Sequence, residues 1–246
     1  AGFINTLAGS GSLLSLPMLI FLGLPANVAN GTNRIAILLQ NIVGVASFKQ
    51  QKVFEFKQGL WLAVPCTAGS LLGAQLAVEM NKVMMERAIG VLLIIMFFLI
   101  IYKPDRWIKG KTDMYKGKPS LLQIIIFFAI GTYGGFIQVG TGYFMLAGLV
   151  LSAGFDVVKA NALKLFIILI YTPFALGIFI LNDQVNYVYG FILAIGNMLG
   201  AFVASRVAVS WGPKVVRYFL LGIIIIASIE LLGIRAYIFE ALNINL

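Results

Sequence analysis

The sequence predicts an all-α membrane protein that crosses the bilayer several times, and three observations lead to this fold class. Only 11% of the 246 residues are charged and 61% are hydrophobic, whereas a soluble domain carries about 25% charged residues. Charge-free runs such as 60–78 and 185–205 have the roughly 20 apolar residues that a spanning helix needs. The third observation is that the second half of the chain repeats glycines and amides of the first. We therefore expect two homologous repeats of membrane helices.

A shift of 131 residues aligns the two halves without a gap over their most informative part. It places GSG at 9–11 on GTG at 140–142, and it places Asn30 on Asn161. Further pairs, some after small adjustments of the shift, are Gly59 with Gly190, Gly69 with Gly200, Gly90 with Gly222, and GFIN at 2–5 with GFIQ at 135–138. Internal repeats in a protein of many membrane helices are typical of secondary transporters, although a duplication kept only for packing would leave the same trace.

Each repeat is expected to contain a glycine-broken or re-entrant segment followed by three spanning helices. In the first repeat, residues 1–102, the break lies at 9–11. The three spans of this repeat are expected at 30–48, 60–78 and 84–102. By comparison with the second repeat, we expect about half a helix to be missing ahead of Ala1. The basic segment 103–119 is expected to link the two repeats in the cytoplasm.

The second repeat, residues 120–246, opens with a charge-free stretch at 120–155 that is longer than one crossing needs. We expect a helix to about residue 139, a turn at 140–142 and a shorter apolar segment at 143–153. About ten to fourteen apolar residues suit a re-entrant or broken segment better than a full crossing. The spans that follow are expected at 159–181, 187–207 and 214–232.

The distribution of basic residues favours repeats that are inverted relative to each other over repeats that run parallel. In the inverted arrangement, the loops 49–57, 103–118 and 206–217 lie on one side of the membrane and carry twelve lysines and arginines. In the parallel arrangement, the three cations of 206–217 move to the other side and the acidic Asp183 joins the basic loops. Cytoplasmic loops carry an excess of Lys and Arg, so we place these three loops in the cytoplasm.

The glycine turns of the two repeats supply the elements of an anion site near the middle of the membrane. Backbone that leaves a helix at this depth must line a cavity or be covered by protein, and glycine permits the turn. A short segment that starts after such a turn presents N–H groups and the positive end of its dipole to an anion. Close helix packing through small residues is the alternative. The turn residues expected at the site are Gly9, Ser10, Gly11, Ser12, Gly140, Thr141 and Gly142.

Two cations lie in corresponding apolar elements, Arg34 in the first repeat and Lys164 in the second. An asparagine, Asn30 or Asn161, precedes each cation by three or four residues and can share its helix face. A charge inside the bilayer costs at least about 2.5 kcal/mol, and Asp156 is the one acidic residue near either cation in sequence. A cation that snorkels to the membrane surface is the alternative. We expect two unpaired cations near positive helix ends, which an anionic substrate would satisfy.

The motifs GFINTLAGSGS and VANGTNRIAIL of the first half, with GGFIQVGTGY and KANALKLF of the second, resemble the sulfite exporter family TauE/SafE. The resemblance covers essentially the whole chain. It implies a secondary carrier for sulfur-containing oxyanions such as sulfite or organosulfonates, which works by alternating access in a bacterial-type cytoplasmic membrane. The oxygens of such anions accept hydrogen bonds, and bonds between charged groups are the stronger class. The substrate-binding residues expected on these motifs are Asn5, Gly9, Ser10, Gly11, Ser12, Asn30, Asn33, Arg34, Gln138, Gly140, Thr141, Gly142, Asn161 and Lys164.

The composition argues against several other functions. The chain has no histidine and one cysteine, Cys66, so we expect no enzyme activity, no metal and no cofactor. No Gly-x4-Gly-Lys-Ser/Thr motif is present, so we expect no nucleotide hydrolysis. The net charge of +9 is assigned to cytoplasmic loops rather than to nucleic-acid binding. The expected partners are a small anion and the lipid bilayer, for a monomer or a homodimer. An anion channel, and a carrier for a carboxylate or an amino acid, remain open alternatives.

Overall fold

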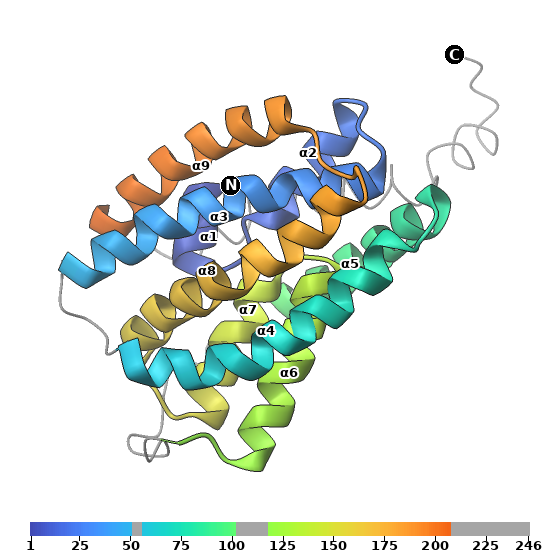
Figure 1. The fold of residues 1–246 in the computed structure, drawn as a ribbon. Coiled ribbons are helices and arrows are strands. Elements are labelled where there is room, and N and C mark those ends of the chain that lie inside the picture. The colour runs from blue at the N-terminus through green and yellow to red at the C-terminus, as the bar shows by residue number, and fades with distance from the viewer. Residues whose placement is uncertain (51–55, 102–117, 208–246) are drawn as a thin grey trace.

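The computed structural model describes residues 1–50, 56–101 and 118–207, and all regular structure in these ranges is helical (Figure 1). The helices of the first half are α1 (Gly2–Ala8), α2 (Ser12–Phe21), α3 (Ala26–Gln50), α4 (Phe56–Val78) and α5 (Lys82–Ile101). Those of the second half are α6 (Leu121–Phe136), α7 (Thr141–Ala147), the π-helix η2 (Gly148–Ser152), α8 (Val157–Leu181) and α9 (Tyr187–Val207). The span expected at 214–232 and most of the linker expected at 103–119 lie outside the described residues.

Both broken segments are interrupted at a glycine in the left-handed region. Gly9, which ends α1, has a φ of 71°, and Gly140, which precedes α7, has a φ of 69°. Two further glycines with positive φ, Gly23 at 94° and Gly154 at 77°, follow the two broken segments. Within each pair the residues are 131 positions apart, which is the shift found in the sequence. Glycine adopts such angles without a steric penalty, so the expected breaks are confirmed at the expected positions.

Helices α3 and α8 pack against each other and run in opposite directions (Figure 1). Gly31 at the start of α3 lies against Phe179 near the end of α8. Val45 near the end of α3 packs with Leu165 near the start of α8. Around this pair, α4 packs on α6 and α8, and α9 packs on α1 and α3. The sequence shift aligns α3 with α8 and α4 with α9, so corresponding helices of the two halves make corresponding contacts.

Helices α4 and α6 approach closely because glycines lie in their contact. A Cβ atom on Gly69 would lie 2.1 Å from the carbonyl oxygen of Phe128, and one on Gly73 would lie 1.9 Å from that of Thr132. From the α6 side, a Cβ atom on Gly131 would lie 2.0 Å from another α4 carbonyl oxygen. Small residues allow membrane helices to pack backbone against backbone, so these glycines serve packing.

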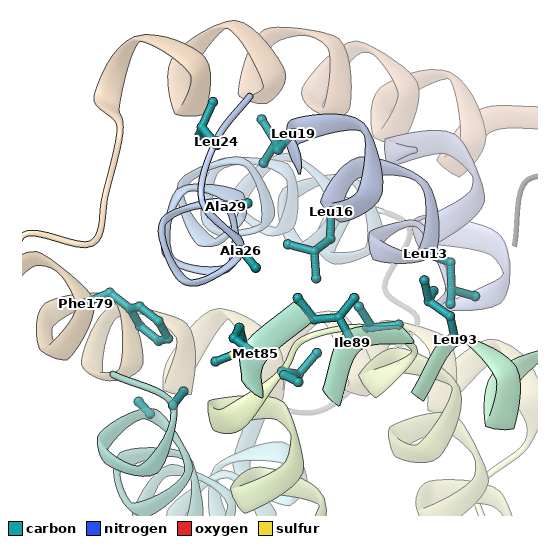
Figure 2. Packing of buried hydrophobic residues seen from close by; sticks show 14 of the residues in the cluster. Leu13, Leu16, Leu19, Leu24, Ala26, Ala29, Met85, Ile89, Leu93 and Phe179 are labelled. Carbon is teal, nitrogen blue, oxygen red and sulfur yellow. The ribbon is translucent and has the colours of Figure 1, made fainter. Parts of the chain in front are cut away.

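An apolar core between α2, α3 and α5 holds the first broken segment in place (Figure 2). Leu13 and Leu16 of α2 point toward Met85, Ile89 and Leu93 of α5, and all five side chains are almost completely buried. The three α5 residues are spaced by four, so they form one stripe along the helix. The short helix α2 is therefore fixed by side-chain packing.

The outer surfaces of the long helices are apolar. Among the described helices, three are long and apolar enough to cross a membrane, namely Gly59–Val78, Val157–Leu181 and Tyr187–Ser205. They expose large side chains outward, including Trp61 at 52% and Leu199 at 63%. A soluble monomer rarely exposes a continuous apolar surface of this kind, whereas a bilayer covers it. The structure therefore agrees with an integral membrane protein.

Helix α3 has the opposite character, because its polar side chains face the interior. Asn30, Asn33, Arg34, Gln40 and Asn41 are among its fully buried polar residues. Their spacing of three, four and seven places them along one face of the helix. Ile42, which lies on another face, is 49% exposed. Helix α3 therefore supplies several amides and one cation to the interior of the described structure.

Candidate functional site

The two glycine turns meet in the interior of the protein. A Cβ atom on Gly9 would lie 2.4 Å from the carbonyl carbon of Gly142, and one on Gly142 would lie 2.6 Å from the Cα atom of Gly9. The backbones of the two turns are therefore in direct contact, one from each half of the chain. This close contact leaves no space for a ligand between Gly9 and Gly142 themselves.

Arg34 reaches from α3 to the carboxyl end of α6. Its Nη1 and Nη2 atoms donate hydrogen bonds to the carbonyl oxygens of Gly134 and Gly135 at 3.1 and 2.5 Å. Asn30, one helical turn earlier, donates from Nδ2 to the carbonyl oxygen of Phe136 at 2.8 Å. The guanidinium also lies 4.5 Å from the centre of the Phe179 ring, within the range of a cation–π contact.

Lys164 makes a corresponding set of contacts from α8 to the carboxyl end of α1. Its Nζ atom donates to the carbonyl oxygens of Asn5 and Thr6 at 3.1 and 3.4 Å. It also donates to the side-chain Oδ1 of Asn161, one turn earlier on α8. Each cation thus binds the broken helix that belongs to the other half of the chain.

These contacts correct one expectation about the cations. Arg34 and Lys164 have no acidic partner among the described residues, but they do not point freely at positive helix ends, because both bind backbone carbonyls at the negative, carboxyl ends of α6 and α1. Both side chains are 0% exposed, so neither reaches out to the surface of the described structure. Cations are favoured at carboxyl ends of helices, which explains how the fold tolerates their burial.

Two glycine contacts refine the alignment of the two halves at their start. Gly2 of α1 packs against Asn197 of α9, and Gly131 of α6 packs against Cys66 of α4. Cys66 and Asn197 are 131 residues apart, so Gly2 occupies the position of Gly131. The sequence pairing of Gly2 with Gly135 is therefore one helical turn out of register.

No carboxylate neutralises the two buried cations within the described ranges. The acidic residues that the structure describes are Glu79, Glu86, Asp156 and Asp183. Three of them are exposed, and Glu86 is paired with Lys82 at 3.9 Å. Backbone carbonyls offer partial charges only, so the described interior retains an excess of positive charge.

Further amides lie along the buried face of α3 that also carries Arg34. Asn33 accepts a hydrogen bond from Ser15 at 2.7 Å, and Gln40 accepts one from Asn5 at 3.2 Å. Each bond uses the side-chain oxygen and leaves the Nδ2 atom of Asn33 and the Nε2 atom of Gln40 without a partner among the described residues. Both polar atoms of the neighbouring Asn41 side chain are also without one. Buried donors of this kind normally bind a polar partner, so they are candidates to contact a ligand or water.

A second group of polar atoms without partners surrounds Arg34. The Tyr171 hydroxyl, both polar atoms of the Gln138 side chain and the Nε atom of Arg34 have no hydrogen-bond partner among the described residues. They lie near one another: a Cβ atom on Gly134 would be 2.8 Å from the Tyr171 hydroxyl, Gly134 itself binds Arg34, and the Gln138 side chain lies close to the Tyr171 hydroxyl. This group could donate several hydrogen bonds to one acceptor-rich molecule.

The remaining expected site residues are buried at the same junction, but they mostly bind the protein itself. Ser10, Ser12 and Thr141 are 1–3% exposed, and the Thr141 hydroxyl donates to the carbonyl oxygen of Ile137 at 3.5 Å. A Cβ atom on Gly11 would collide with α1, and one on Gly140 would collide with the side chain of Met96. These residues shape the two turns.

The comparison with known proteins decides the family. Residues 1–231 match the family described as sulfite exporter TauE/SafE. This chain belongs to the TauE/SafE family. A probable membrane transporter protein, ORF9 of Sinorhizobium sp, is 30% identical over 95% of this chain and 88% of its own length. Another, YfcA of Escherichia coli K12, is 28% identical over 94% and 86%, and YjnA of Bacillus subtilis is 23% identical over 94% and 96%. No solved structure is significantly similar to the chain.

The structure adds residues to the candidate site of this TauE/SafE protein that the sequence motifs did not include. They are Ser15, Gln40, Asn41 and Tyr171. The sequence could have indicated Gln40 and Asn41, because they follow Asn33 and Arg34 by seven residues and therefore lie on the same helix face. The sequence could not have indicated Tyr171 as a site residue, since a single tyrosine in an apolar span is ordinarily a packing residue.

Proposed function

We propose that this membrane transporter is a secondary carrier that moves a sulfur-containing oxyanion, such as sulfite or an organosulfonate, across the cytoplasmic membrane by alternating access. One observation carries the proposal. Arg34 and Lys164 are fully buried, and no acidic side chain of the described residues pairs with either. An anionic substrate offsets this charge, whereas a cationic substrate would add to it.

The substrate contacts in this proposal come from the polar group around Arg34. Within this group, three donors have no partner, namely the Nε atom of Arg34, the amide of Gln138 and the hydroxyl of Tyr171. A sulfite or sulfonate group has three oxygens that accept hydrogen bonds, so it can use all three donors at once. The guanidinium contributes charge as well as a donor, which makes its bond the strongest of the set.

The moving parts of the proposed carrier are two inverted repeats. Two features support the inversion, of which the first is the antiparallel packing of α3 and α8, which correspond by the sequence shift. The second is that Gly59 packs on Phe166 while Gly190 packs on Ile35, since both members of these pairs are 131 residues apart. Rocking of one repeat against the other at the contact of the glycine turns would open the site to either side.

The substrate class is tested by a binding screen on the purified protein. We expect one of sulfite, thiosulfate, sulfoacetate or sulfate to raise the melting temperature in a saturable way, because a ligand that binds only the folded state stabilises it. At a concentration of about 100 times Kd the gain is about 2.7 kcal/mol. Chloride at equal ionic strength is the control. Stabilisation by carboxylates or amino acids alone would show that the proposed substrate class is wrong.

Tyr171→Phe removes only the hydroxyl group of Tyr171 and so tests whether this hydroxyl contacts the substrate. The ligand-free variant is expected to be as stable as the parent or more stable, because a buried hydroxyl without a partner costs about 1–3 kcal/mol. Its affinity for the stabilising oxyanion is expected to fall about tenfold, since a hydrogen bond to a charged group contributes about 1.5–3 kcal/mol. Thermal unfolding with and without the oxyanion measures both effects.

Tyr133→Phe is the matched control, because the Tyr133 hydroxyl donates to the carbonyl oxygen of Val139 at 2.6 Å. This variant is expected to lose about 1 kcal/mol of stability and to keep its affinity. If Tyr171→Phe behaves in the same way, the Tyr171 hydroxyl serves the fold and does not contact the substrate.

A further inference from the structure

The hydrogen bonds of the two buried cations carry an inference that does not depend on the identity of the substrate. We propose that Asn30 with Arg34, and Asn161 with Lys164, are two equivalent positioning pairs. Each pair closes the carboxyl end of the broken helix in the opposite half of the chain and thereby holds the two glycine turns together.

The first pair completes the hydrogen bonding of the end of α6. The last four carbonyls of a helix have no partner within it. In α6 the carbonyl of Tyr133 accepts from the backbone N–H of Ile137 at 2.9 Å. Arg34 donates to the next two carbonyls, those of Gly134 and Gly135, and Asn30 donates to the last one, that of Phe136. Every carbonyl of the final turn is thus satisfied, and three of the four depend on this pair.

The second pair acts on the end of α1. An ammonium group has three N–H donors. All three donors of Lys164 are used, two by the carbonyls of Asn5 and Thr6 and one by the side chain of Asn161. Lys164 has no donor left for a direct bond to a substrate, whereas Arg34 retains its Nε atom. Lys164 is therefore a positioning residue that acts through α1.

The crossed arrangement links the two halves at the breaks. Helix α1 ends directly at Gly9, and α6 ends four residues before Gly140. The pairs hold these two helix ends from the opposite half, so they also hold the contact between Gly9 and Gly142. A movement that separates the halves at this point must break the bonds of at least one pair.

Hydrogen–deuterium exchange of the full chain in lipid nanodiscs, without substrate, tests this proposal. Lys164→Met is expected to make exchange in residues 2–14 about tenfold faster, since it removes the charge-assisted hydrogen bonds to the carbonyls of α1. Exchange in residues 121–136 is expected to stay at the rate of the parent protein. Arg34→Met is expected to make exchange faster in residues 121–136 and to leave exchange in residues 2–14 unchanged. Each substitution would loosen a helix of the other half.

Three variants complete the test. Lys164→Arg keeps the charge and several donors, so it is expected to restore most of the protection at residues 2–14. Lys159→Met removes a charge from the same helix, where Lys159 contacts the Phe155 ring, and is expected to leave both segments unchanged. Asn161→Ala keeps both cations and replaces Lys164→Met if that variant does not fold. Faster exchange confined to the substituted helix, equal acceleration everywhere, or no change would each overturn the proposal.

Discussion

Replacing Arg34 with methionine is expected to lower the affinity for the oxyanion by about a hundredfold or more. Truncating one partner of a buried charged pair costs about 2–5 kcal/mol, and about 2.7 kcal/mol corresponds to a hundredfold. The same change leaves the carbonyls of Gly134 and Gly135 without their donors, so the melting temperature is also expected to fall. Titration of the purified variant with the oxyanion that stabilises the parent protein measures the first effect, and thermal unfolding without ligand measures the second.

Two further variants separate the loss of charge at Arg34 from damage to the fold. Arg34→Lys keeps the positive charge but lacks the planar fork that serves two carbonyls at once, so intermediate affinity and stability are expected. Lys159→Met removes one positive charge from a partly exposed position on α8 and is expected to bind like the parent. If Arg34→Met binds the oxyanion as tightly as the parent protein, Arg34 does not contact the substrate.

Gly9→Ala is expected to prevent the protein from reaching its folded state in the membrane. The new Cβ atom would lie 2.4 Å from the carbonyl carbon of Gly142, and backbone atoms cannot move aside as a flexible side chain can. The residue would also keep a φ of 71°, which costs roughly 1–2 kcal/mol for any residue with a Cβ atom. The yield of monodisperse protein after extraction in mild detergent measures the effect.

Two other glycines provide matched controls for Gly9→Ala. Gly23 has a φ of 94° but open space around it, so Gly23→Ala isolates the backbone strain and is expected to cost about 1–2 kcal/mol. Gly177 lies inside α8 with open space, so Gly177→Ala is expected to stabilise the protein by about 1 kcal/mol through helix propensity. A Gly9→Ala variant as stable as Gly23→Ala would mean that the two turns are not in contact.

Much of the fold was predictable because its signals are local. Charge-free runs mark the long helices, and a glycine that needs positive φ marks each break, so the expected turns at 9–11 and 140–142 agree with the structure. The repeat could be found for a related reason, since glycines at turns and helix contacts tolerate few substitutes. The exact register at the start of the chain could not be found, because Gly2 and Gly135 match in letters while the packing pairs Gly2 with Gly131.

The sequence indicated most of the polar residues of the candidate site, but it did not indicate which groups they bind. The polar face of α3 and the cations Arg34 and Lys164 stand out in the sequence because polar groups are costly in a bilayer. Sequence spacing cannot show which carbonyls these cations reach, since those carbonyls lie about a hundred residues away or more in the other half of the chain. The hydroxyl of Tyr171 joins the site only through the packing of α8 beside Gly134, which is a tertiary event.

The most direct test of anion transport is exchange in proteoliposomes that contain the purified protein. Vesicles loaded with an unlabelled sulfur oxyanion are placed in a trace of the same anion carrying a radioactive label, and uptake of the label is followed. We expect saturable uptake that depends on the unlabelled anion inside, that falls strongly with Arg34→Met, and that is accompanied by no single-channel current. Uptake equal to that of protein-free vesicles for every sulfur oxyanion, or unsaturable flux with channel currents, would contradict a carrier.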